Sequence, residues 1–217
     1  MVPPGRRLTF GRPDNMRAHA SDRIGRARRP RKKRKARKKS RGVQQWIVRR
    51  LLLGALIIVV LSWAVVLPFR WVDPPTTAFM LQDSSGRSPL FHEWSAWSNF
   101  GDATPLAVIA SEDQKFADHF GFDIKSIRES VGEFNDGAPL RGASTITQQV
   151  AKNMYLWPGK NFLRKGIEAW FTLLIEASWP KKRILEIYLN IAEFGPGVYG
   201  ISSASEFYFN KAPAALS

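Results

Sequence analysis

The sequence contains no cysteine, and this absence excludes a disulfide framework and any zinc or iron–sulfur site that cysteine would hold. Acidic residues are scarce in the first fifty positions, where 2 Asp+Glu stand against 19 Lys+Arg. Residues 51–217 carry 16 acidic and 14 basic residues, so the formal net charge of +15 comes from the N-terminal segment. The rest of the chain is nearly neutral, which argues against nucleic-acid binding over its whole surface.

The first 48 residues also lack hydrophobic periodicity. They are rich in Arg, Pro and Gly, and their charge peaks in the run RKKRKARKK at 31–39. Such a composition cannot bury enough apolar surface to offset chain entropy, so we expect a disordered cytoplasmic tail. We expect its basic side chains to bind anionic membrane lipids. No aromatic residues are interleaved with the peak of charge to stack on bases, so we expect no nucleic-acid partner.

A stretch without charge follows at 51–69, with the sequence LLLGALIIVVLSWAVVLPF. As a helix it would be about 28 Å long, close to the ~30 Å thickness of a bilayer's hydrocarbon core. A buried core helix would show a polar face, and this stretch shows none. A cleaved signal peptide would need a short basic segment before the span and small residues after it. The stretch therefore predicts a transmembrane signal anchor at 49–71, and the basic residues before it predict a cytoplasmic N-terminus.

The chain beyond the span is expected to be mostly α. We expect residues 72–104 to be a linker and entry segment, in which 74–85 lead into a short extended segment, and residues 105–217 to form a domain. Apolar periodicity predicts helices at 105–116, 144–156, 162–179 and 181–194. No run of any length alternates between polar and apolar residues as a strand does.

Glu112 is the first residue of a candidate site segment, 112–123, in this domain. On a helix that continues past it, Phe116 and His119 would share its face. A carboxylate beside aromatic rings has a raised proton affinity and can act as a general acid or base, although a solvated acidic face would have the same spacing. A lone histidine is more typical of a structural hydrogen bond, and with Asp123 alone it is too little for a metal site.

A glycine-led helix start at 142–153, GASTITQQVAKN, carries a dense polar face. Its hydroxyl, amide and ammonium side chains are those of Ser144, Thr145, Gln148, Gln149 and Lys152. Amide N–H groups at a helix start favour an anion. A DNA-recognition helix would look similar, but export and the near-neutral charge argue against it. A capped amphipathic helix without function stays open as an alternative.

Three cations and a carboxylate follow, Lys160, Arg164, Lys165 and Glu168. With Lys152 the three cations would hold a phosphate, and Glu168 would be a second carboxylate. The i, i+4 spacing of Arg164 and Glu168 equally fits a surface salt bridge. Two carboxylates, a set of polar donors and several cations beside a membrane anchor favour glycosyl-phosphate chemistry on a lipid-carried substrate.

Five blocks of the sequence resemble the monofunctional peptidoglycan glycosyltransferases, a lysozyme-like family that polymerises lipid II. They cover about 130 residues in the family's order, and they read PPTTAFML (74–81), EDQKFADHFGFD (112–123), GASTITQQVAKN (142–153), RKGIEA (164–169) and KKRILEIYLNIAEFGPGVYGI (181–201). The resemblance implies a lysozyme-like, mostly α glycosyltransferase domain at 105–217 without a transpeptidase domain, and a smaller membrane-facing jaw within 122–141.

The resemblance also implies roles for single residues. Glu112 would be the general base that takes the proton from the acceptor's 4-hydroxyl, with inversion at the anomeric carbon and release of undecaprenyl pyrophosphate. Glu168 would be the second catalytic carboxylate, at the donor site. The substrate-binding residues would be Asp113, Phe116, His119, Ser144, Thr145, Gln148, Gln149, Lys152, Lys160 and Arg164. No cofactor is implied, and a divalent metal ion beside the pyrophosphate is left open.

The partners that the resemblance implies are lipid II, the growing glycan strand and other proteins of cell-wall synthesis or division. Membrane lipids would bind the transmembrane helix and the basic tail. The family type implies a single-pass protein of the inner membrane with a periplasmic catalytic domain.

Two features depart from the family's pattern. Lys160 stands where the family usually carries arginine, which keeps the charge but loses the bidentate fork. The sequence ends at Ser217, about where the family continues into a further helix, so we expect an exposed apolar patch and lower stability. A lysozyme-like lyase or hydrolase, which needs no cation cluster, and an inactive membrane scaffold remain as alternatives.

Overall fold

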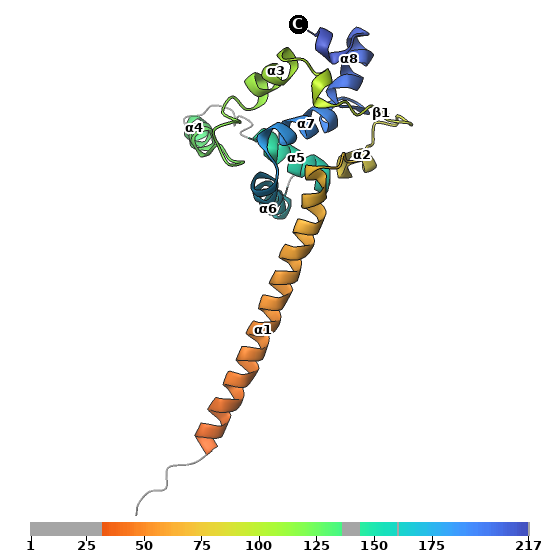
Figure 1. Ribbon diagram of the computed structural model, residues 1–217. Coiled ribbons are helices and arrows are strands. Elements are labelled where there is room, and N and C mark those ends of the chain that lie inside the picture. Colours follow the sequence, from red (N-terminus) through yellow and green to blue (C-terminus); the bar gives the residue numbers. More distant parts are fainter. Residues whose placement is uncertain (1–31, 136–143, 160, 217) are drawn as a thin grey trace, which may run out of the picture. The chain divides into compact units, whose positions relative to one another are not determined.

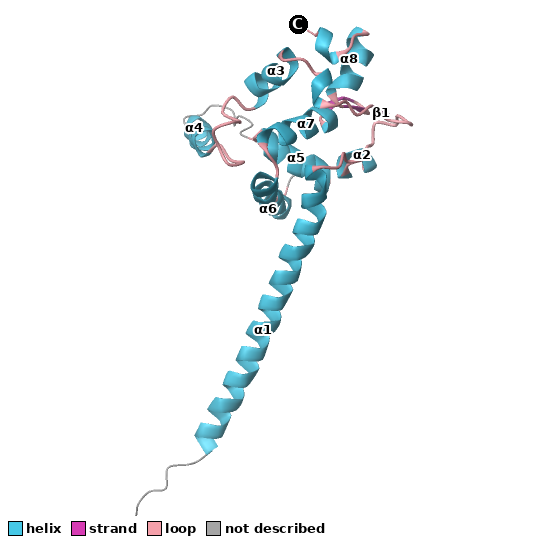
Figure 2. Ribbon diagram, in the orientation of Figure 1, coloured by secondary structure: helices cyan, strands magenta, loops and turns pink. Residues whose placement is uncertain are grey.

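The computed structural model describes residues 32–135, 144–159 and 161–216, and the chain divides into two units, residues 1–50 and 51–217. The helices and strands are α1 (Lys32–Val66), η1 (Leu67–Arg70), α2 (Ala78–Leu81), β1 (Phe91–His92), η2 (Trp97–Asn99), α3 (Ala103–Glu112), α4 (Ile124–Asn135), α5 (Ile146–Tyr155), α6 (Phe162–Ser178), α7 (Lys181–Ile191), β2 (Glu193–Gly195), β3 (Val198–Tyr199), α8 (Ile201–Phe209) and η3 (Pro213–Ala215) (Figure 1). Helices dominate the ribbon in Figure 2, so the prediction of a mostly α domain is confirmed.

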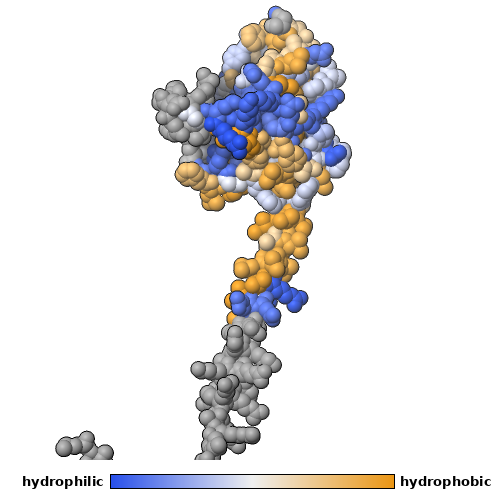
Figure 3. All heavy atoms as spheres, turned by 90° about the vertical axis from the view of Figure 1, so that its left-hand side faces the viewer, coloured by the Kyte–Doolittle hydropathy of each residue, from blue (hydrophilic) through white to orange (hydrophobic). Residues whose placement is uncertain are grey.

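Within the described part of the chain, one helical stretch is long and apolar enough to cross a membrane. It covers Val43–Arg70, and its most apolar 18-residue window has a mean hydropathy of 2.7. Only 6% of that window is buried, so the stretch is not the core helix of a globular domain. Figure 3 shows the apolar surface of this stretch, and apolar surface recurs on the lower part of the domain. These properties are compatible with a membrane anchor.

The helix begins earlier than the sequence indicates. Residues 32–48, expected to be disordered, belong to α1, while residues 1–31 of the expected tail lie outside the described residues. Lys, Arg and Ala are good helix formers, and adding them to a helix already nucleated in the apolar stretch avoids the cost of a new nucleus. The composition argument for disorder is therefore wrong for 32–48.

The C-terminal end of α1 is built into the domain. Val66 is fully buried, and its carbonyl oxygen accepts a hydrogen bond from Trp179 Nε1 at 3.1 Å. Arg183 Nε donates to the carbonyl oxygen of Phe69 in η1 at 3.0 Å. A helix end leaves its last carbonyl groups without intrahelical donors, and these two side chains supply donors instead.

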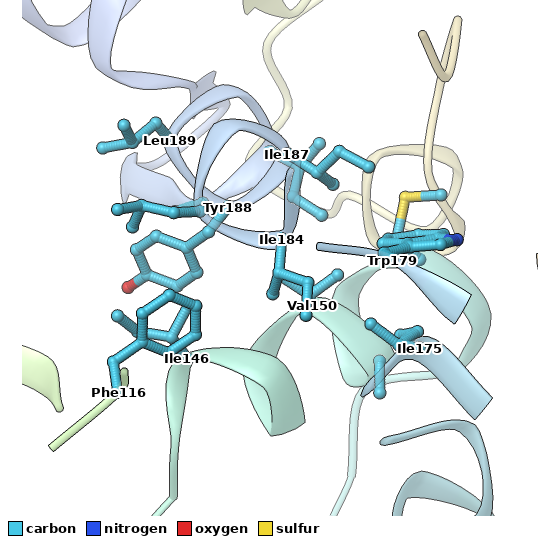
Figure 4. Packing of buried hydrophobic residues seen from close by; sticks show 14 of the residues in the cluster. Phe116, Ile146, Val150, Ile175, Trp179, Ile184, Ile187, Tyr188 and Leu189 are labelled. Atoms are coloured by element: carbon cyan, nitrogen blue, oxygen red, sulfur yellow. The ribbon is translucent and has the colours of Figure 1, made fainter. Parts of the chain in front are cut away.

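The hydrophobic core lies among α5, α6 and α7. In Figure 4, Ile146 and Val150 of α5 point toward Tyr188 and Ile184 of α7, and Ile175 of α6 approaches from the side. The four aliphatic side chains have no exposed surface. Burying one side chain of this size contributes about 1.5–3 kcal/mol. Because α5 packs against both neighbours, its polar N-terminal end is held in a fixed position.

Three short strands, which the sequence pattern does not predict, form a sheet in the order β1-β3-β2. β1 pairs in parallel with β3 in the register Phe91↔Val198, and β2 pairs antiparallel with β3. Strands of two or three residues are too short for an alternating pattern to be visible. Gly200 follows β3 with a φ of +83°, and a Cβ there would lie 2.6 Å from the carbonyl oxygen of Asn190, so only glycine fits.

The predicted boundaries differ from the structure at three places. The segment 74–85, expected to be a linker that leads into a short extended segment, contains α2, which starts where Thr77 Oγ1 accepts a hydrogen bond from Met80 N at 3.2 Å. α3 ends at Glu112 rather than at residue 116. α7 ends at Ile191 because the residues that follow pair in β2.

An aromatic patch is exposed on α8. Phe207, Tyr208 and Phe209 have 46%, 50% and 63% of their surface exposed. Phe207 also packs on Phe91, with ring centroids 5.8 Å apart. Three adjacent aromatic side chains of α8 are thus open to solvent.

Candidate active site

Glu112 is the last residue of α3, and its side chain is exposed. Gln149 of α5 donates a hydrogen bond from Nε2 to Glu112 Oε2 at 2.8 Å. The hydroxyl of Tyr188 on α7 donates to Gln149 Oε1 at 3.4 Å. Burial raises the pKa of Tyr188, and the charge of Glu112 raises it further, so the phenol keeps the proton that it donates. Three helices therefore orient one carboxylate and leave it open to solvent.

The helical face expected for Glu112, Phe116 and His119 is not formed, because the chain leaves the helix after Glu112. Asp113 turns inward instead. Its Oδ2 accepts a hydrogen bond from Ile146 N at 3.1 Å, and its Oδ1 lies 2.9 Å from His119 Nε2. A carboxylate is favoured at the N-terminus of a helix, here α5. His119 makes the structural hydrogen bond that is typical of a lone histidine.

The N-terminus of α5 is closed by a capping box. Thr145 Oγ1 accepts from Gln148 N at 3.2 Å, and Gln148 Oε1 accepts from Thr145 N at 3.0 Å. The Thr145 hydroxyl also donates to the carbonyl oxygen of Gly121 at 2.7 Å. Phe116 is equally buried, with Lys181 Nζ 4.5 Å from its ring centroid. The side chains of Gln148 and Phe116 are thus used inside the fold, behind the surface of the site, and the Thr145 hydroxyl is engaged in the cap.

A polar cavity of about 290 Å³ opens between the end of α3, the helix α4 and the start of α5. The residues that line it are Glu112, Asp113, Gln114, Lys115, Asp123, Ser126, Glu129, Ser144 and Thr145. Its volume is near the lower end of the range for small-ligand pockets. The carboxylate of Glu112 and the hydroxyl of Ser144, both expected at the site, meet in this cavity.

Glu168 of α6 lies in a different setting, with 2% of its surface exposed. Its Oε2 is 3.0 Å from Arg164 Nη1, and its Oε1 is 2.5 Å from Lys165 Nζ. Because Arg164 is also buried, this pair is not the surface salt bridge that the spacing allowed. Lys165 Nζ lies 3.4 Å from Ser144 Oγ, which connects the cation cluster to the cavity. Arg164 Nε has no hydrogen-bond partner among the described residues.

Lys152 lies one helical turn beyond Gln149 on α5 and is partly buried, with Nζ 5.1 Å from the ring centroid of Phe79. Burial lowers the pKa of the Lys152 ammonium, the negative charge of Glu168 raises it, and Arg164 lowers it further. A partly desolvated ammonium near other cations concentrates positive potential, which favours an anionic ligand.

One predicted site residue, Lys160, lies outside the described residues. Lys165 was expected in the cation cluster, and its contact with Glu168 places it there. Other residues at the site were not predicted: Gln114, Lys115, Ser126 and Glu129 line the cavity, and Phe79 and Tyr188 contact site residues. Phe79 and Tyr188 give no local signal, because their contacts with Lys152 and Gln149 join distant segments of the chain.

Among the described residues, no three His, Cys, Asp or Glu side chains gather as metal ligands. Both carboxylate oxygens of Glu168 already contact cations. The described part of the chain therefore offers no preformed cage for a divalent metal ion.

Known proteins are similar in sequence to this domain. The model of the transglycosylase family matches residues 83–217, which include the cavity and the cation cluster. The chain belongs to the transglycosylase family. Its resemblance to the peptidoglycan glycosyltransferases is thereby confirmed at the level of the family.

Several relatives of this transglycosylase-family chain are named biosynthetic peptidoglycan transglycosylase, which is a glycosyltransferase. The protein of Shewanella frigidimarina (strain NCIMB 400) is 55% identical over 148 residues, that of Marinomonas sp. (strain MWYL1) 48% over 173, and that of Xylella fastidiosa (strain M23) 45% over 181. The matches cover 68%, 80% and 80% of this chain. The chain spans 64%, 76% and 74% of the relatives' own lengths.

Proposed function

We propose that this chain is a peptidoglycan glycosyltransferase that polymerises lipid II into glycan strands. The observation that carries the proposal is the pairing of two unlike features. An exposed carboxylate, Glu112, is oriented by Gln149, and a cluster of cations, which Lys165 links to the same cavity through Ser144, stands beside it. A carboxylate for proton transfer and cations for a diphosphate are what transfer from a lipid-linked sugar requires.

In the proposed reaction, Glu112 accepts the proton of the acceptor's 4-hydroxyl. The oxygen attacks the anomeric carbon of the growing chain from the face opposite the diphosphate. The new glycosidic bond forms as the bond between that carbon and the diphosphate oxygen breaks, so the configuration inverts and undecaprenyl pyrophosphate leaves with the electron pair. Lys152, Arg164 and Lys160 are proposed to stabilise the charge that develops on the leaving group.

Glu168 is proposed to act on the donor side through the cations that it contacts. Its two oxygens hold Arg164 and Lys165 at fixed positions, so the cluster is already arranged before the charge develops. Ser144 and Gln149 are proposed to contact the sugars. Among the other predicted substrate-binding residues, Asp113, Phe116, His119, Thr145 and Gln148 are proposed to shape the wall of the site, since their polar groups or rings are engaged within the fold.

The apolar stretch of α1 is proposed to span the inner membrane once. The basic residues that precede it favour a cytoplasmic N-terminus, which places the catalytic domain on the periplasmic side. Lipid II would then reach the cavity from the outer leaflet, with its diphosphate near the membrane surface.

A lysozyme-like hydrolase is the rival function, because it too would use one catalytic glutamate. Cleavage of a glycan that carries no diphosphate needs no cation cluster, so the role of Lys152 separates the two functions. An inactive scaffold would need neither Glu112 nor Lys152.

The test uses the full chain in detergent with labelled lipid II, and glycan polymer is resolved on a gel. We expect polymer from the wild type and none from Glu112→Gln or Lys152→Glu. Glu206→Gln and Lys211→Glu, which make the same changes at exposed positions far along the chain on and beyond α8, serve as matched controls and should retain polymerisation. If the wild type and Lys152→Glu both cleave preformed glycan, the protein is a hydrolase instead. If the wild type neither polymerises lipid II nor cleaves glycan, the inactive scaffold is the function that fits.

A further inference from the structure

An apolar groove of about 830 Å³ lies between α1 and α6, and none of its lining residues lines the polar cavity. Its lining includes Ala55, Ile58 and Ser62 from α1 and Leu163, Gly166 and Trp170 from α6. The polar groups of Ser62 and Trp170 are joined to each other, with Trp170 Nε1 donating to Ser62 Oγ at 3.1 Å. The groove therefore offers no unused polar side chain at this contact, and its ligand must be apolar.

The volume of the groove lies within the range of pockets that hold a ligand of several hundred daltons. One wall is the apolar stretch that is long enough to cross a membrane. On the rim, Phe162 and Leu163 have 98% and 72% of their surface exposed, which is unfavourable in water and favourable against hydrocarbon. These features indicate a lipid chain rather than a water-soluble partner.

The position of the groove selects among lipid chains. α6 presents the groove on the face that carries Leu163, Gly166 and Trp170, while Arg164 and Lys165, at 100° per residue, leave the same turn about 130° away, toward the other side of the helix. A helix with its side chains is only about 10–12 Å across. A ligand whose diphosphate binds the cations can therefore reach the groove with its hydrocarbon chain after crossing about one helix width.

We propose that the groove between α1 and α6 holds the phosphate-proximal part of the substrate's polyprenyl chain. This inference rests on the proposed function, because it assigns the diphosphate of the same substrate to Arg164 and Lys165. It gives α1 a part in substrate binding beyond anchoring.

The first experiment fills the groove from either wall. A Cβ on Gly166 would have no neighbouring atom within 4 Å, so there is room for a side chain to begin there, and Gly166→Leu adds bulk to the groove. Ala55→Phe fills it from α1. Ala64→Phe is the matched control, since residue 64 lies, at 100° per residue, on the face of α1 opposite residue 55. The wild type and the variants are supplied with lipid II that carries either the full undecaprenyl chain or a short prenyl chain.

We expect the wild type and Ala64→Phe to prefer the long-chain substrate in kcat/KM. In Gly166→Leu and Ala55→Phe this preference should fall by at least about tenfold. A tenfold change equals the contribution of fewer than two buried methylene groups of the prenyl chain. Thermal unfolding in detergent checks that the variants are folded. An unchanged preference in both folded groove variants would overturn the inference and leave the proposed function intact.

A second experiment needs no turnover, so it decides the inference separately from the proposed function. The full chain in vesicles is irradiated with a polyprenyl diphosphate that carries a photoreactive group near the phosphate-proximal end of its chain. We expect labelling of the segment 162–171, and loss of that labelling in Gly166→Leu. Labelling elsewhere would overturn the inference. Equal labelling by a photoreactive phospholipid that undecaprenyl pyrophosphate does not displace would assign the groove to a bulk membrane lipid, and that too would overturn it.

Discussion

Glu112 and Glu168 are the same residue type in opposite surroundings. Glu112 is exposed at the end of α3 and accepts one hydrogen bond from a neutral amide. Glu168 is buried on α6 and contacts two cations. The Glu112 carboxylate is open to a reacting hydroxyl, whereas both oxygens of the Glu168 carboxylate are occupied by the buried Arg164 and by Lys165. Surroundings, rather than residue type, therefore separate the proposed base from the proposed positioning residue.

Removing the buried carboxylate should have the largest effect on this comparison. Glu168→Ala leaves the buried guanidinium of Arg164 without its charge partner, and we expect a loss of about 3 kcal/mol in the free energy of unfolding. Glu112→Ala should change this free energy by less than about 0.5 kcal/mol, because its side chain is exposed. Denaturant titration of both variants measures the difference. Equal stability of the two variants would contradict the distinction.

Asp113 provides a second comparison with Glu112, because it is the next residue in the sequence but its side chain is buried. Asp113→Ala removes the acceptor of Ile146 N and the partner of His119, and we expect a loss of about 2 kcal/mol. Asp118→Ala, at an exposed position of the same turn region, is the control. Hydrogen exchange at the N-terminus of α5 should speed up only in the first variant. Unchanged exchange there would show that Asp113 does not hold this helix end.

Thr145 should have a smaller effect of the same kind. Thr145→Ala removes the cap of α5 and the hydrogen bond to the carbonyl oxygen of Gly121, at a cost of about 1 kcal/mol. Thr145→Ser keeps the hydroxyl and should retain most of the stability. Comparing the midpoints of urea unfolding tests this, and a serine variant as unstable as the alanine variant would assign the effect to packing of the methyl group.

Lys152 should show the smallest effect on stability, and the size of this effect should depend on pH. Burial lowers the pKa of Lys152 in the folded chain, so below that pKa the charged form makes folding less favourable. Lys152→Met removes this penalty, so at neutral pH the variant should be at least as stable as the wild type while losing polymerisation. The wild type should gain relative to the variant as the pH rises through the lowered pKa toward the ordinary lysine range.

Urea unfolding of both proteins at several pH values measures the Lys152 effect. Lys211→Met, at an exposed position, is the control and should show no pH-dependent difference from the wild type. A difference between Lys152→Met and the wild type that grows with pH would contradict the role of burial.

Local sequence signals predicted much of the fold. α6 begins after Asn161, whose Oδ1 accepts a hydrogen bond from Arg164 N at 2.7 Å, and it ends shortly before Pro180, as capping and proline rules require. The span was visible because apolar runs of this length are rare in soluble chains. In both cases the information lies within a few neighbouring residues.

Other features depend on contacts between distant segments, and the sequence alone did not reveal them. α3 stops at Glu112 although the pattern continues, because Asp113 pairs with Ile146 N, 33 positions away. The burial of Arg164 with Glu168 could not be told from a surface pair, since the spacing is the same in both. The sequence was therefore a better guide to which residues lie near the cavity than to which of their side chains stay unengaged and exposed to a ligand.

The fully buried Val66 has a practical consequence. Its side chain belongs to the hydrophobic cluster of the domain, and its carbonyl oxygen is the acceptor for Trp179 Nε1. A shortened protein that starts just after the apolar stretch, made to obtain a water-soluble form, would lose a core residue and leave an indole N–H without its acceptor. The C-terminal end of α1 is thus one of the packing elements of the domain, and a soluble version needs a replacement for it rather than a simple deletion.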